Sequence, residues 1–375
     1  MDLHDKFGLT RVLNAYDKAT FLGGARVLPE IAEVVCASMG ETFRVAELQE
    51  VAGEIIARET GAESGCVTAC AAAAITLNVA ACMSGADPER VAQLPDTDGM
   101  PSRAVMQAGH CVNFGAPVAQ MARLSGADVI TVGDEDGCTP EEILRALDHE
   151  DVACAVAVES YHTADYPGLG LREFIEIAHS AGVPVVVDAA TQELRLREIM
   201  ALGPDLVGCS AHKYLVSTTA GIVAGRADLL EAVLAQGRGI GRTMKVGKEG
   251  IFGVLAAWDT PMQRDTSAWS AHERRKCELV IERIKQVEGL SPGLSPDPNG
   301  CPFDRVRVAV DEAISGFSAR SLREALRQDD PAVEVRVYGR DPGAFYINTT
   351  ELTDSEVETV CEHIEATLRR ARGSK

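Results

Sequence analysis

Apolar runs and helical repeats alternate along the middle of the chain. Between residues 66 and 235, patterns of helical period such as TPEEILRALDH and LREFIEIAHSAG separate short apolar segments. The segments that have the composition of buried strands are SRAVMQAG, DVITVGD, VACAVAVES, VPVVVDAA and PDLVGCSA. This alternation predicts an α/β fold with a mostly parallel sheet that helices cover on both faces. Ligands of such folds bind at the carboxyl ends of the strands.

The flanking regions have different patterns. Residues 28–60 and 238–287 have mainly helical periodicity, whereas 290–304, rich in proline and glycine, favours a boundary loop. After that loop, the pattern predicts three strands, in RVRVAVDEA, VEVRVYG and AFYINTT. It predicts two helices, in SARSLREALRQ and from Asp354 onward. We therefore expect an N-terminal helical segment (1–60) that packs on the large domain or on a partner. A large α/β domain (61–260) follows, and then a small C-terminal α+β domain (261–375) that begins with a linker helix.

Composition and charge narrow the class of protein. The 375 residues are 46% apolar and 25% charged, as in globular proteins, and the formal net charge is −20. Such a charge argues against a nucleic-acid partner and against binding to an anionic membrane surface. The N-terminus has no apolar core typical of a signal peptide, and CAAAAITLNVAAC is too short to span a bilayer. We expect a cytoplasmic protein.

The eleven cysteines are expected to be reduced thiols. Their number is odd, and no Cys-x-x-Cys pattern occurs. Cys66 and Cys70 lie four residues apart without a nearby histidine, so we expect no metal there, because zinc sites need four converging ligands.

Lys213 is isolated among arginines. Between Lys18 and Lys245 the chain has 13 arginines and only this lysine, directly after an apolar run. Arginine stays charged, whereas a buried lysine can lose its proton and act as a nucleophile. Lys213 is therefore a candidate Schiff-base lysine. The alternative is a lysine whose stem lies along the end of a strand and whose amine pairs with a carboxylate.

Three further features accompany Lys213. Asp188 ends an apolar strand 25 residues earlier, an interval that one βα crossover fits. The stretch from Thr68 to Ala71 opens an alanine-rich helix, whose N-terminal N–H groups suit a phosphate. His110 follows a strand and could cover a flat ring. Each feature has a structural alternative: a loop acid, tight helix packing and a helix-capping histidine. Taken together they match pyridoxal phosphate, which needs an amine, a carboxylate, an anion cup and a flat neighbour.

The same stretches resemble a known family. The chain is similar, almost from end to end, to the selenocysteine-synthase-like branch of the fold-type-I pyridoxal-phosphate enzymes. The stretches that carry this resemblance are RVLNAYDKATFLGG, ELQEVAGEIIARETGAESGCVTACAAAAI, AHSAGVPVVVDAATQ and GRGIGRTMKVGKEGIFGVLAA. That branch includes L-seryl-tRNA(Sec) selenium transferases and the D-glucosaminate-6-phosphate ammonia-lyase type. The resemblance implies the fold-type-I transferase fold and pyridoxal 5'-phosphate as cofactor.

The resemblance also implies roles for individual residues. Lys213 would form the Schiff base, and Asp188 would partner the pyridine nitrogen. His110 would lie near the ring, and Arg242 and Lys245 would bind an anionic group of the substrate. The residues implied near the phosphate are Ala69, Cys70, Ala71 and Ser210.

Three positions depart from the family pattern. Ala211-His212 replaces the usual Gly-Gly pair before the lysine, and His212 could either shuttle protons or point into the sheet. The following YLVSTTAG lacks the usual Gly-Pro turn, and Arg44-Val45 replaces an apolar-acid pair. Because these changes fall where substrate or cofactor contacts are expected, the family's substrate cannot simply be transferred.

We expect a lyase that acts on a small, anionic amino acid or amino sugar acid by Cα deprotonation, β-elimination and deamination. The chain starts almost at the core motifs and is acidic, which disfavours a tRNA substrate. Racemisation, aldol cleavage and selenium-transferase-like chemistry remain alternatives, as does a non-catalytic binding or assembly role. The resemblance implies a homodimer or higher homo-oligomer with the active site at the subunit interface.

Overall fold

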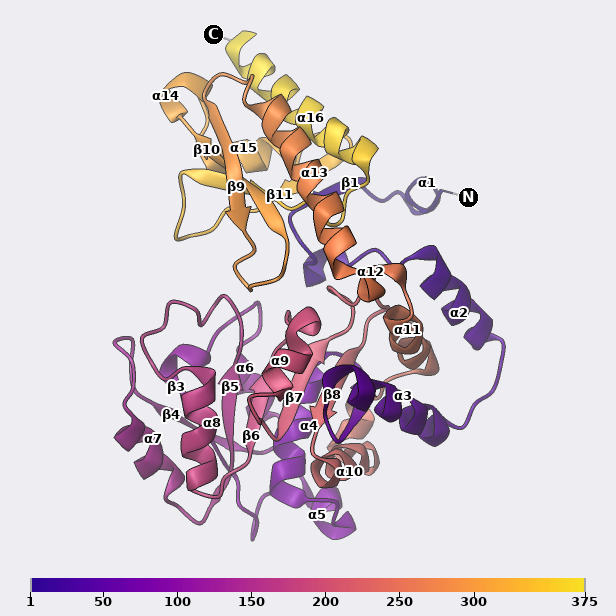
Figure 1. The fold of residues 1–375 in the computed structure, drawn as a ribbon, viewed down its shortest axis with the longest axis vertical. Coiled ribbons are helices and arrows are strands. Elements are labelled where there is room, and N and C mark those ends of the chain that lie inside the picture. Colours follow the sequence, from indigo (N-terminus) through magenta and orange to yellow (C-terminus); the bar gives the residue numbers. More distant parts are fainter. Residues whose placement is uncertain (1, 374–375) are drawn as a thin grey trace. The chain divides into compact units, whose positions relative to one another are not determined.

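The computed structural model describes residues 2–373, which form two compact units (Figure 1). One unit comprises residues 27–260, and the other combines residues 2–26 with the described residues from 261 onward. Among the described residues, no helix combines the length and apolar character needed to cross a membrane.

Residues 27–260 are built around a seven-stranded sheet with the order β2-β8-β7-β6-β5-β3-β4. Its strands are β2 (Ser64–Thr68), β3 (Arg103–Gln107), β4 (Asp128–Val132), β5 (Val152–Val158), β6 (Val185–Asp188), β7 (Leu206–Ser210) and β8 (Gly221–Gly225). The strands from β7 to β4 run parallel, and β8 is antiparallel to both of its neighbours. The predicted α/β fold with a mostly parallel sheet is confirmed.

Helices cover this sheet on both faces (Figure 1). The helices of this unit are α2 (Pro29–Met39), α3 (Val45–Thr60), α4 (Ala71–Ser84), α5 (Pro88–Gln93), α6 (Val118–Arg123), α7 (Pro140–Leu147), α8 (Leu171–Ser180), α9 (Leu196–Met200), α10 (Ala227–Ala235) and α11 (Lys248–Trp258). Helix α4 has no charged residue and is buried over most of its length, which places it in the core. Thr139 is the N-cap residue of α7 and forms a capping box with Glu142.

The other unit has two small sheets. A three-stranded antiparallel sheet has the order β12-β10-β9, and a parallel pair joins β1 to β11. The strands are β1 (Val12–Ala15), β9 (Leu290–Pro296), β10 (Asp304–Val310), β11 (Ala332–Val335) and β12 (Ala344–Ile347). The helices are α1 (Leu3–Phe7), α12 (Pro261–Arg264), α13 (Thr266–Ile284), α14 (Glu312–Ser315), α15 (Ala319–Leu326) and α16 (Asp354–Gly373).

The expectation of a loop throughout 290–304 is wrong. Residues 290–296 form β9, which pairs with β10 so that Pro292 lies opposite Val308 and Pro296 opposite Asp304. Strand β9 is at the edge of its sheet, where a proline without an N–H group is tolerated.

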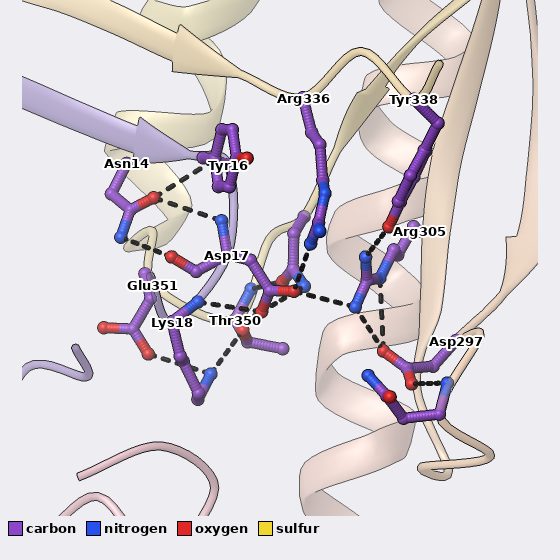
Figure 2. Close-up of polar contacts among 12 residues, drawn as sticks. Asn14, Tyr16, Asp17, Lys18, Asp297, Arg305, Arg336, Tyr338, Thr350 and Glu351 are labelled. Atoms are coloured by element: carbon purple, nitrogen blue, oxygen red, sulfur yellow. Dashed lines mark hydrogen bonds and ion pairs between the residues drawn. The ribbon is translucent and has the colours of Figure 1, made fainter. Parts of the chain in front are cut away.

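A buried ionic cluster joins the two chain segments of this unit (Figure 2). The guanidinium of Arg305 lies 2.8 Å from Asp17 and 2.5 Å from Asp297, and its side chain is only 1% exposed. Lys18 forms a second buried pair with Glu351 at 2.8 Å. Removing one partner of such a pair leaves an uncompensated buried charge, so the stability of this unit depends on the cluster being complete.

Candidate active site

The carboxyl ends of β6 and β7 bring Asp188 and Lys213 to one edge of the sheet. Asp188 is the last residue of β6 and pairs with Gly208 of β7, and Lys213 lies three residues after the end of β7. The positive charge of Lys213 lowers the pKa of Asp188, so the two groups are close enough to interact. Nζ of Lys213 forms no hydrogen bond or ion pair with the described residues, which leaves the amine available for a ligand.

Asp188 is a buried carboxylate with an unused acceptor. Burial raises its pKa to about 6, while Lys213 and the backbone N–H of Ala190 oppose this shift. Its Oδ1 atom is buried and accepts no hydrogen bond from a described residue. A buried acceptor of this kind can accept a hydrogen bond from the protonated nitrogen of a pyridine ring, so Asp188 fits pyridoxal phosphate as a ligand.

The loop that carries Lys213 is tightly constrained. Its backbone closes on itself through Val216 N–H to Lys213 O (3.1 Å) and Ser217 N–H to Ala211 O (3.0 Å). Val216 has φ 53°, a left-handed conformation that is strained for a β-branched residue. The N–H of Tyr214 donates to Glu193 Oε1 at 3.2 Å. The strain and these bonds fix the backbone on both sides of Lys213.

The candidate phosphate site is the start of α4. The first N–H groups of a helix lack intrahelical acceptors, and Cys70 is the N-cap residue, with Sγ accepting from Ala73 N–H at 3.4 Å. Gly221 of β8 pairs with both Thr68 and Ser210, and a Cβ at Gly221 would lie 2.4 Å from the Cys70 carbonyl carbon. The structure thus brings the phosphate candidates Ala69, Cys70, Ala71 and Ser210 around one helix N-terminus, which suits a phosphate.

His110 lies one strand away from Asp188. Its Nδ1 accepts a hydrogen bond from the N–H of Val158 at 2.9 Å, and Val158 is paired with Asp188. The proton of the neutral ring is therefore on Nε2. Burial lowers the pKa of His110 to about 4, so the ring is neutral at physiological pH. Its role beside a cofactor ring stays a prediction.

His212 is buried next to Lys213. Burial lowers its pKa, and the charge of Lys213 lowers it further. Its Nδ1 lies 3.2 Å from Ser210 Oγ, so one of these two groups donates to the other. The neutral ring could accept a proton, but whether it shuttles protons stays a prediction.

Arg242 and Lys245 lie farther along the chain on an exposed 3₁₀ segment, Ile240–Met244, and at its C-cap. That segment packs on α4, because a Cβ at Gly241 would lie 2.9 Å from Leu77 Cδ2. Neither Arg242 nor Lys245 forms an ion pair with a described residue, so both cations can receive an anion. No contact between described residues joins either side chain to Lys213 or Asp188, and their role in substrate binding stays a prediction.

A charged pair at the same edge of the sheet was not expected from the sequence. Glu159 follows β5 and donates its N–H to the Asp188 carbonyl at 2.8 Å. Its carboxylate lies 3.5 Å from the guanidinium of Arg195, which also donates to Gln192 Oε1 at 3.1 Å. The available signal was a charged residue directly after the apolar run VACAVAV. Among the residues that the structure describes, no group of histidine, cysteine and acidic side chains is arranged to hold a metal ion.

Comparisons with known proteins agree with this geometry. Residues 103–298 match the family model of class-V aminotransferases. The chain is 32% identical over 370 residues to D-glucosaminate-6-phosphate ammonia lyase of Salmonella typhimurium, covering 99% of both chains. It is 33% identical over 370 residues to a 5'-C-glycyluridine monooxygenase-decarboxylase of a Streptomyces species, covering 97% of this chain and 92% of that one. A solved structure of D-glucosaminate-6-phosphate ammonia-lyase superposes with a TM-score of 0.90 at 31% identity, covering 99% of both chains.

Proposed function

The chain belongs to the class-V aminotransferase family of pyridoxal-phosphate enzymes, and we propose that it is a lyase that releases ammonia from a small, anionic amino acid or amino sugar acid. The observation that carries this proposal is the end-to-end similarity to an ammonia lyase, at 32% identity over 99% of both chains. The placement of Asp188, Lys213 and the α4 N-terminus supports it.

Bound pyridoxal phosphate supplies an electron sink that stabilises negative charge at the substrate's Cα. In this proposal Lys213 would hold the aldehyde of the cofactor, Asp188 would keep its pyridine nitrogen protonated, and the α4 N-terminus together with Ser210 would hold its phosphate. His110 would lie beside the ring as a neutral imidazole, because burial lowers its pKa to about 4.

The residues of the chain move the protons of the reaction. Lys213 Nζ would take the Cα proton of the substrate. His212, which burial and the charge of Lys213 keep neutral, is the candidate that would accept this proton from the Lys213 ammonium and pass it to the leaving β-substituent. When that substituent is a hydroxyl, water leaves and water returns on hydrolysis, so the net products are a 2-oxo acid and ammonia.

We assign recognition of the acidic group of the substrate to Arg242 and Lys245. Both are exposed and have no carboxylate partner among the described residues. In a chain of net charge −20, a local basic cluster can draw an anion to the protein. An arginine suits a carboxylate or a phosphate equally, because it binds either through two parallel hydrogen bonds.

A second candidate is oxidative decarboxylation. The specific reason is the equally high identity, 33%, to the monooxygenase-decarboxylase. Both reactions use the same cofactor site, and they differ in the bond that breaks at Cα. Racemisation, aldol cleavage and selenium transfer remain lower-ranked alternatives within the family.

The test is to mix the holoenzyme with L- and D-amino acids and with amino sugar acids, including phosphorylated ones. We expect ammonia and a 2-oxo acid in equal amounts from an anionic substrate, with neither oxygen uptake nor carbon dioxide release. Carbon dioxide with oxygen consumption would support the second candidate instead, and inverted stereochemistry without ammonia would indicate a racemase. Lys213→Ala is the inactive control, and borohydride should no longer attach the cofactor to that variant.

A further inference from the structure

Asn78 is a buried amide without hydrogen bonds. It lies midway along α4, its side chain is 0% exposed, and neither Nδ2 nor Oδ1 has a hydrogen-bond partner among the described residues. A buried amide in this state is costly, and leucine would fill the same space without the cost. The cost of burying this amide indicates that Asn78 has a function other than packing.

The sheet register places Asp188 on the face that α4 covers. Asp188 of β6 pairs with Gly208 of β7, and paired residues of parallel strands point to the same face. Two residues earlier, Val186 pairs with Leu206, and both belong to the apolar cluster that includes Ala74 and Leu77 of α4. The side chain of Asp188 follows Val186 on this face.

Gly208 lets α4 come close to the strand at this level. A Cβ at Gly208 would lie 3.0 Å from Ala74 Cβ and 3.5 Å from Asn78 Nδ2. Because Gly208 has no side chain, the space between Asn78 and the neighbouring Asp188 is not filled from β7. An unused buried donor and an unused buried acceptor, Asp188 Oδ1, thus occur on one face beside the same glycine.

We infer that Asn78 is a positioning residue of the active site, whose Nδ2 donates a hydrogen bond to an ordered water that in turn donates to the carboxylate of Asp188. This inference rests on the proposed role of Asp188 toward the cofactor. A carboxylate has about four acceptor sites. The N–H of Ala190 and a pyridine N–H use two of them, so a third donor can be accommodated.

The hydrogen bond has an electrostatic purpose. Burial disfavours the charged form of Asp188, and the opposing influences are Lys213 and the N–H of Ala190. Helix α4 adds no charged side chain. Burial raises the pKa of the Cys209 thiol on β7, so this group is neutral. His110, which accepts a hydrogen bond from Val158 of β5, is also neutral. Asn78 is thus the neutral donor on the α4 side that favours the ionised carboxylate, and with it a protonated pyridine nitrogen.

The test compares Asn78→Leu with Asp188→Asn and with the control Thr76→Val. Thr76 is on the same helix, but its hydroxyl donates to Met121 O at 2.8 Å. The readouts are the affinity of the apoprotein for pyridoxal phosphate, the pH titration of the bound cofactor's absorbance, and kcat with KM. For Asn78→Leu we expect about tenfold weaker cofactor binding, a titration midpoint moved by about one unit and a lower kcat at unchanged KM. Thr76→Val should leave the titration midpoint unchanged.

The outcomes distinguish the role of Asn78 from the proposed role of Asp188. An Asn78→Leu protein that is more stable, with wild-type cofactor affinity and titration, would overturn the inference. If Asp188→Asn itself leaves the cofactor's properties unchanged, the proposed role of Asp188 fails first. Should the leucine variant not fold, Asn78→Asp preserves the size of the side chain and sets a like charge near Asp188. An unaltered titration in Asn78→Asp would equally reject the role of Asn78.

Discussion

Asp188 carries its charge inside the core of residues 27–260, and this makes stability depend on pH. Burial raises its pKa from 3.8 to about 6 in the folded protein. Between these values the folded state holds a proton that the unfolded state has lost, so the free energy of unfolding falls as pH rises through this window. The expected loss is about 2–3 kcal/mol for the apoprotein.

Urea unfolding of the apoprotein between pH 4 and pH 7 measures this effect. The control is Asp188→Asn, which removes the titrating group, so its stability should change less over the same range. Parallel pH profiles for the two proteins would show that Asp188 does not titrate as the burial argument requires.

Arg242 is the residue to which substrate recognition is assigned. Arg242→Ala should lower kcat/KM by about ten- to a thousand-fold, mainly through KM, because a charge-assisted pair with the anion is lost. The absorbance of the bound cofactor should not change. Arg238→Ala, which removes an exposed charge of the preceding 3₁₀ turn, is the matched control with a smaller effect. Wild-type kinetics in the Arg242 variant would reject the assignment.

Some site residues could be predicted from the sequence and others could not. Lys213 and Asp188 follow apolar strands, and strand order alone brings such ends together at one edge. The fixed tautomer of His110 depends on a bond to Val158, and the position of Asn78 depends on which turn of α4 faces Gly208. Both depend on three-dimensional register, which spacing along the chain does not contain.

At the scale of elements, the junction between β8 and α4 is the most restrictive feature of the cofactor site. A methyl group at Gly221 would lie 2.4 Å from the Cys70 carbonyl carbon and 2.5 Å from Thr68 Oγ1. Gly221→Ala should therefore displace the start of α4, weaken cofactor binding about tenfold or more and cost about 1–3 kcal/mol of stability. Equilibrium binding of pyridoxal phosphate to the apoprotein measures the first effect.

Gly293→Ala is the control for that experiment. Gly293 is also in a strand, but a Cβ there would meet no atom within 4 Å. Its alanine variant should bind the cofactor normally. Equal affinity in the Gly221 and Gly293 variants would mean that the α4 N-terminus does not hold the phosphate.

The regular elements of residues 27–260 were predictable because hydrophobic period and caps agree, as in α7 with its Thr139 capping box. Strand β9 was not, because its prolines resemble a loop until the partner strand β10 is known. Strand β1 gave no signal at all, since Val12 pairs with Ala332 across almost the whole chain. The local sequence pattern predicts local structure, whereas these two strands form because each pairs with another strand.

At the scale of the whole molecule, we expect at least a homodimer. Large apolar side chains are exposed on and beside α2 and α3: Val34, Met39, Phe43, Val45 and Val51. A subunit interface over these helices would remove the apolar side chains from water. Light scattering at micromolar concentration should therefore give at least twice the 39.9 kDa of one chain. A mass of one chain would contradict this, and in that case Met39→Glu would not change the mass either.

The unit formed by the two ends of the chain should depend on its buried ionic cluster. Asp17 lies 2.8 Å from Arg305 and 3.4 Å from Arg336, and Asp17→Ala would leave these guanidinium groups with less negative charge in the core. We expect a loss of about 3–5 kcal/mol in the stability of this unit. Asp2→Ala, which removes an exposed partner of Arg11, should have no measurable effect, because water already screens that pair. Limited proteolysis followed by mass spectrometry can assign the change, since early cleavage in Asp17→Ala should fall before residue 27 or after residue 261 and leave 27–260 intact. Equal protection of the Asp17 and Asp2 variants would mean that β1 and α16 hold the N-terminal residues without the cluster.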